Sequence, residues 1–66
     1  MNIPKLKGKI KEKDKNYAEC ASAVGCSITS FSNKMNGISK FYIDELEKLG
    51  NFLDMTQAEK NDIFLS

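Results

Sequence analysis

The sequence predicts an all-α fold of five short helices, and three observations support it. Apolar residues recur four positions apart, as in Leu6–Ile10 and Phe31–Met35, which places the members of each pair on one helix face. Asn16–Glu19 and Thr56–Glu59 have the spacing of capping boxes, which begin helices. The dipeptide Asn36-Gly37 is a strong helix stop.

The first two helices follow from their end signals. Pro4 fits the first turn of a helix, where its missing N–H costs nothing, so a helix is expected from about Pro4 to Lys13. Gly8 lies inside it and costs about 1 kcal/mol relative to Ala unless something packs closely there. A second helix begins at Tyr17, after the capping box, and ends at Gly25 in a left-handed conformation.

The remaining three helices are placed in the same way. Ser27 is a good N-cap for a helix from about Ile28 to Met35. Four apolar residues at helical spacing then predict a buried face on a helix from about Ile43 to Leu53; they are Ile43, Leu46, Leu49 and Leu53. The second capping box opens a short last helix that ends around Phe64.

Length and composition limit the classes of function. A chain of 66 residues forms one domain, residues 1–66, with one small core. The two cysteines, Cys20 and Cys26, are expected to be reduced and buried, and without any histidine a metal site is not expected. No apolar run is long enough to span a membrane, so a soluble cytoplasmic protein is expected. An enzyme is not expected either, because the cysteines lack a nearby base, and no cofactor is implied.

Charge is distributed unevenly along the chain. Residues 1–40 hold eight lysines against three acidic residues, and residues 41–66 hold two lysines against six acidic residues. The two parts therefore carry net charges of +5 and −4. We expect the first part to be able to face a polyanion while the second faces away, although a lysine-rich segment can also be only a solvated surface.

Two helices of about eight residues joined through Gly25-Cys26-Ser27 match a helix-turn-helix, whose second helix enters the DNA major groove. The chain resembles the lambda repressor-like family of phage Cro and small repressor proteins over nearly its whole length. The resemblance rests on the joint spacing of Ala21, Val24, Gly25, Cys26, Ser27, Phe31 and Asn36-Gly37. Where many relatives join two helices by a buried Arg–Glu pair, this chain has Ile10 and Met35.

The resemblance implies a sequence-specific regulator of transcription that binds double-stranded DNA as a dimer. Base edges would be contacted from the second helix of the motif by Ile28, Thr29, Ser32 and Asn33. The DNA backbone would be contacted by Asn16, Tyr17, Ser27, Lys34, Asn36 and Lys40. Tyr17 stands where the family usually has a phosphate-binding Gln. With no Arg on this helix, we expect half-sites that contain A·T pairs and few strongly contacted guanines.

The homodimer is expected to be weak, because the domain itself must supply every dimer contact. The expected interface is the start of the last helix or the apolar end of the chain, and its residues are Thr56, Ile63, Phe64 and Leu65. The alternative function is a protein-interaction module on the same scaffold, such as an antitoxin or antirepressor. That module would have little affinity for DNA.

Overall fold

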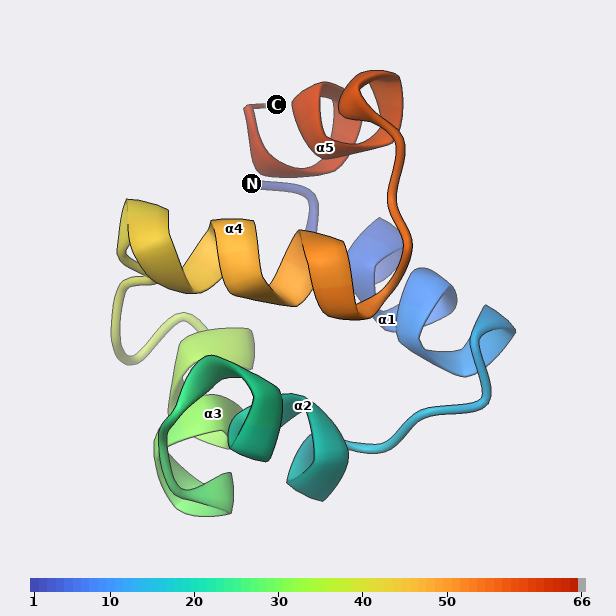
Figure 1. Ribbon diagram of the computed structural model, residues 1–66. Coiled ribbons are helices and arrows are strands. Elements are labelled where there is room, and N and C mark those ends of the chain that lie inside the picture. Colours follow the sequence, from blue (N-terminus) through green and yellow to red (C-terminus); the bar gives the residue numbers. More distant parts are fainter. Residues whose placement is uncertain (66) are drawn as a thin grey trace.

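The computed structural model describes residues 1–65, and this part of the chain is all-helical, with five helices and no strand. Figure 1 shows α4 lying between α5 on one side and the pair α2 and α3 on the other, with α1 beside α4. The helices are α1 (Ile3–Glu12), α2 (Tyr17–Val24), α3 (Ile28–Met35), α4 (Ile43–Phe52) and α5 (Gln57–Phe64). The prediction of an all-α fold is therefore confirmed.

The helix starts are fixed by side-chain caps. Both predicted capping boxes form: Asn16 and Glu19 exchange hydrogen bonds at the start of α2, and Thr56 and Glu59 do so at the start of α5. Ser27 accepts a hydrogen bond from the backbone N–H of Ser30 and so caps α3. These bonds satisfy N–H groups that have no partner within the helix.

The helix ends use the left-handed conformation. Gly25 ends α2 with φ of 89°, and Gly37, with φ of 78°, follows α3. A residue without a Cβ adopts this conformation at no steric cost, which is why both predicted stops hold. Gly8 is different, because a Cβ built on it would meet nothing within 4 Å. No close packing therefore requires a glycine here, and Gly8 makes α1 less stable than an alanine would.

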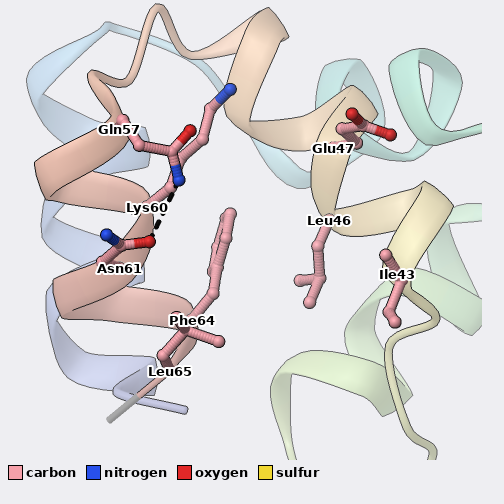
Figure 2. A pocket seen from close by; sticks show the side chains of 8 residues that line it. All are labelled: Ile43, Leu46, Glu47, Gln57, Lys60, Asn61, Phe64 and Leu65. Atoms are coloured by element: carbon pink, nitrogen blue, oxygen red, sulfur yellow. Dashed lines mark hydrogen bonds between the residues drawn. The ribbon is translucent and has the colours of Figure 1, made fainter.

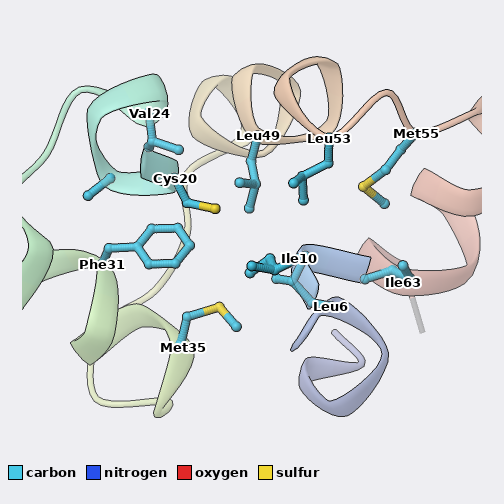
Figure 3. Packing of buried hydrophobic residues seen from close by; sticks show 11 residues of the cluster. Leu6, Ile10, Cys20, Val24, Phe31, Met35, Leu49, Leu53, Met55 and Ile63 are labelled. Carbon is cyan, nitrogen blue, oxygen red and sulfur yellow. The ribbon is translucent and has the colours of Figure 1, made fainter. Parts of the chain in front are cut away.

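A single apolar core joins α1 to the other helices (Figure 3). Phe31 and Met35 of α3 point into it, as predicted, and face Leu6 and Ile10 of α1. Ile10 and Met35 thus form a buried apolar contact. The buried apolar residues are Leu6, Ile10, Cys20, Ala21, Val24, Phe31, Met35, Leu49, Leu53, Met55 and Ile63.

The prediction for α4 was wrong at its first residue. Leu49 and Leu53 are fully buried, but Leu46 is half-buried and Ile43 is 84% exposed. Ile43 is the first residue of α4, six residues before Leu49. Periodicity assigned it to a face correctly, but the core does not reach that far along the helix. Cys26, expected to be buried, is half-buried.

The separation of charge is only partial, because three of the eight lysines in residues 1–40 pair with acidic residues of the second part. Lys5 binds Asp62 at 2.6 Å, and Lys9 binds both Glu59 and its helix neighbour Glu12. These pairs tie α1 to α5, together with a hydrogen bond of 2.7 Å from the Asn2 N–H to the carbonyl oxygen of Ile63. Two of the four lysines of α1 therefore have acidic partners within the molecule.

Candidate nucleic-acid interface

The pair α2 and α3 is held at a fixed angle by a three-residue turn. In that turn the N–H groups of Gly25 and Cys26 both donate to the carbonyl oxygen of Ala21, at 2.9 and 3.0 Å. The side chain of Ser27 then caps α3, so the third helix begins directly after the turn. The side chains of α2 that face the core are small, namely Cys20, Ala21 and Val24, and they allow α3 and α4 to pack closely against it.

The outer face of α3 carries the four residues predicted to contact bases. Ile28 is 53% exposed and Thr29 is exposed, while Ser32 and Asn33 are half-buried. Ile28 and Ser32 are four apart, as are Thr29 and Asn33, so all four share one side of the helix. The side-chain amide of Asn33 makes no hydrogen bond within residues 1–65 and is free to bind a ligand. The face is polar except for Ile28.

The first turns of α2 and α3, and the residues that follow α3, offer hydrogen-bond donors to an anion. Asn16 and Ser27 are exposed, and each uses its side-chain oxygen to cap a helix. The first backbone N–H groups of α2 and α3 have no partner inside their helices and carry partial positive charge. Asn36 and Lys40 are exposed beyond the other end of α3. A phosphate backbone that runs past both ends would meet donors at each.

Tyr17 is braced by the core beneath α3. Its ring meets the Phe31 ring edge-on, with centroids 5.2 Å apart, and Phe31 meets Phe41 in the same way at 5.8 Å. Phe41 therefore turns inward, against the core. The three rings connect the start of α2, the middle of α3 and the loop after it. The Tyr17 side chain is thus held at the start of α2 by its packing against Phe31.

Lys34 does not lie on the surface. It is 7% exposed, and its ammonium group donates to Glu45 Oε1 at 2.9 Å and to the Lys40 carbonyl oxygen at 3.2 Å. The Tyr42 ring lies 5.2 Å from the same nitrogen. These contacts join α3 to the first turn of α4 and fix the loop between them. The group is not available to a phosphate, so we remove Lys34 from the predicted backbone contacts.

The two buried lysines, Lys34 and Lys9, lower the pKa values of the glutamates that they bind, Glu45 and Glu59. Burial alone would raise the pKa of Glu45, but the Tyr42 N–H and the Lys34 ammonium group lower it below its usual value. The pKa of Glu59 falls to about 2, because Lys9 and the Thr56 N–H both bind the charged carboxylate. The same pair raises the pKa of Lys9 above 10.5. Neither ion pair could be predicted from the sequence, because a lysine in a basic segment gives no sign of burial.

The residues predicted to form the dimer interface are divided between the core and the surface. Ile63 is 5% exposed and belongs to the core, so it is corrected to a core residue. Phe64 is half-buried and Leu65 is 78% exposed. Thr56 is exposed, and its side-chain oxygen caps α5. Only the end of the chain keeps the apolar surface that was predicted.

Comparisons with family models, curated proteins and solved structures found no match to this chain. Within residues 1–65, no helix has the length and apolar character needed to cross a membrane, since the longest have 10 residues. The same residues contain no cluster of three or more side chains placed to bind a metal ion.

Proposed function

We propose that this protein is a sequence-specific DNA-binding regulator of the Cro or small-repressor type, with a lambda repressor-like fold and α3 in the major groove. One observation carries the proposal: Ile28 and Thr29 in the first turn of a capped α3, and Asn33 one turn further on, share one face of the helix. An isoleucine that is 53% exposed gains nothing in water. Against a thymine methyl group it gains apolar contact.

The dimensions of α3 suit this role. An α-helix with its side chains is about 10–12 Å across, and the major groove is about 12 Å wide. In this position the Asn33 amide pairs with adenine N6 and N7, and Ile28 and the Thr29 methyl group pack on thymine. Asn16, Tyr17, Ser27, Asn36 and Lys40 contact phosphates and set the orientation of α3.

Affinity for one half-site is modest. Three lysines of the basic part form ion pairs inside the molecule, namely Lys5, Lys9 and Lys34. Fewer phosphates are neutralised than the +5 charge of residues 1–40 would allow. Two copies on an inverted repeat, with their α3 helices about 34 Å apart, compensate for this.

The test is a DNA titration by fluorescence anisotropy, with duplexes recovered from a random pool. Asn33→Ala should weaken binding about 5- to 150-fold, because a bidentate base contact contributes about 1–3 kcal/mol. Ser22→Ala, a change at an exposed serine of α2 outside the proposed contacts, should have no effect. The logarithm of the association constant should also fall linearly with the logarithm of salt concentration. Equal affinities for wild type and Asn33→Ala would reject the proposed contact.

A second candidate is a protein-interaction module, favoured by an apolar groove between α4 and α5. Under this alternative the protein binds DNA weakly and without dependence on Asn33. The same titration separates the two functions, because a protein-interaction module has no specific duplex to recover from the pool.

A further inference from the structure

The four lysines of α1 form two rows on opposite flanks of the helix. Lys5 and Lys9 are four residues apart and face α5, where acidic residues bind both. Lys7 and Lys11 are also four residues apart, and both are exposed. An α-helix turns by about 100° per residue, so the core-facing residues of α1 lie between the two rows. Lys7 and Lys11, which we call the α1 lysine row, therefore point away from α5.

The α1 lysine row begins beside the loop that follows α3. Ile3 lies one turn before Lys7 on the same flank of the helix. It lines a hollow together with Gly37 and Lys40, which belong to that loop. Side chains four residues apart lie one above the other on a helix, so Lys7 and Lys11 extend this side of the molecule along α1. A phosphate backbone bound to Lys40 therefore lies on the same side of the molecule as the row.

Neither ammonium group of the row has a partner in the part of the chain that the structure describes. Five of the other eight lysines have one. Lys5, Lys9 and Lys34 form ion pairs, Lys15 lies over the Phe52 ring, and Lys60, in the groove between α4 and α5 shown in Figure 2, donates to Asn51 at 3.1 Å. Like charges four residues apart repel each other on a helix, so the row adds nothing to the stability of α1. Its charge is available to an anion.

We infer that the α1 lysine row binds phosphates of the DNA backbone as a second contact surface beside α3, an inference that rests on the proposed function. Each ammonium group is a compact charge on a flexible stem of four carbons, which can follow a phosphate without a fixed geometry. Phosphate contacts fix orientation and carry no sequence information. The row thus strengthens binding to every duplex, and it replaces the charge that is held in the buried pair of Lys34 and Glu45.

Removing the row should change the salt dependence of DNA binding. Each phosphate contact contributes about 0.9 to the slope of the logarithm of the association constant against the logarithm of salt concentration. The double variant Lys7→Ala with Lys11→Ala should therefore reduce the magnitude of that slope by about 1.8. Alanine is the strongest helix former and both side chains are exposed, so α1 should stay folded.

The measurement is a fluorescence anisotropy titration at several salt concentrations from about 50 to 200 mM. It compares a duplex recovered from the random pool with a duplex of random sequence. The matched control is Lys5→Ala with Lys60→Ala, which removes the same net charge from lysines that have partners inside the molecule. The control should leave the slope unchanged. Circular dichroism of each variant confirms that it is folded.

Neutral methylphosphonates, placed one at a time along the recovered duplex, locate the contact. Each one removes the charge of a single phosphate, so binding of the wild type should weaken at the phosphates that the row contacts. The double variant should be insensitive at those same positions, because the lysines that bind there are gone. The control variant should keep the sensitivity of the wild type.

Three results would overturn the inference: a slope for the double variant equal to that of the wild type, an equal reduction by the control, or a double variant that keeps the full sensitivity to every methylphosphonate. The random-sequence duplex offers α3 no specific bases, so its slopes test the row whether or not the proposed base contacts form. A reduced slope without any effect of Asn33→Ala rejects only the proposed function. An unchanged slope with a clear effect of Asn33→Ala rejects only the inference.

Discussion

Replacing Lys34 with methionine tests whether the buried ion pair between α3 and α4 is structural. Lys34→Met keeps the apolar part of the side chain and removes the ammonium group. Glu45, whose side chain is 15% exposed, then keeps only the N–H of Tyr42 as a partner. The carbonyl oxygen of Lys40 also loses its donor.

The expected loss follows from this burial. Breaking a buried pair by removing one partner costs about 3–5 kcal/mol, because the remaining charge is left without compensation. The residual exposure of Glu45 and its bond to the Tyr42 N–H place this case at the low end, at about 3 kcal/mol. Lys5→Met is the control, because its pair with Asp62 is more than half exposed on both sides. It should cost about 0–1 kcal/mol.

Urea unfolding followed by circular dichroism measures both losses, provided that the slope of each transition is unchanged. A further variant, Lys34→Met with Glu45→Gln, should recover part of the stability, because the uncompensated charge is gone. A loss for Lys34→Met no larger than that for Lys5→Met would refute the argument. So would a double variant less stable than Lys34→Met alone.

Three further outcomes are expected. Gly8→Ala should stabilise the protein by about 0.5–1 kcal/mol in the same urea assay, because the added methyl group meets nothing within 4 Å; destabilisation would contradict this. Lys9 holds the pKa of Glu59 at about 2, below its ordinary 4.5, so stability present above about pH 4.5 should be lost as the pH falls towards 2. Glu59→Gln should flatten that part of a pH series of unfolding curves, and an unchanged slope would reject the link. Burial raises the pKa of Cys20 to about 11, so in mass-spectrometric alkylation kinetics at pH 8 it should react far more slowly than Cys26; equal rates would contradict its burial.

The helices were predictable because their end signals are local. Asn16, Thr56 and Ser27 cap helices through residues three positions away, and Gly37 stops α3 through its own backbone conformation. Such interactions need no knowledge of the rest of the fold. The bounds of α2 and α3 match the prediction, while α1 and α4 each end one residue earlier than expected.

The partners of the lysines were not predictable in the same way. Lys9 binds Glu59, which is 50 residues away along the chain, and Lys34 binds Glu45 across a loop. A count of charges along the sequence treats these lysines as free, and only the packing of α1 on α5 and of α3 on α4 pairs them. Ile43 was misplaced for a related reason, since periodicity gives a face but not the extent of the core.

Selection of bound DNA from a random pool measures whether α3 contacts specific base pairs. We predict recovery of inverted repeats whose half-sites contain A·T pairs and whose centres lie about one helical turn apart. Recovery should depend on Asn33. A pool that shows no enrichment, or the same enrichment with Asn33→Ala as with the wild type, would contradict the claim.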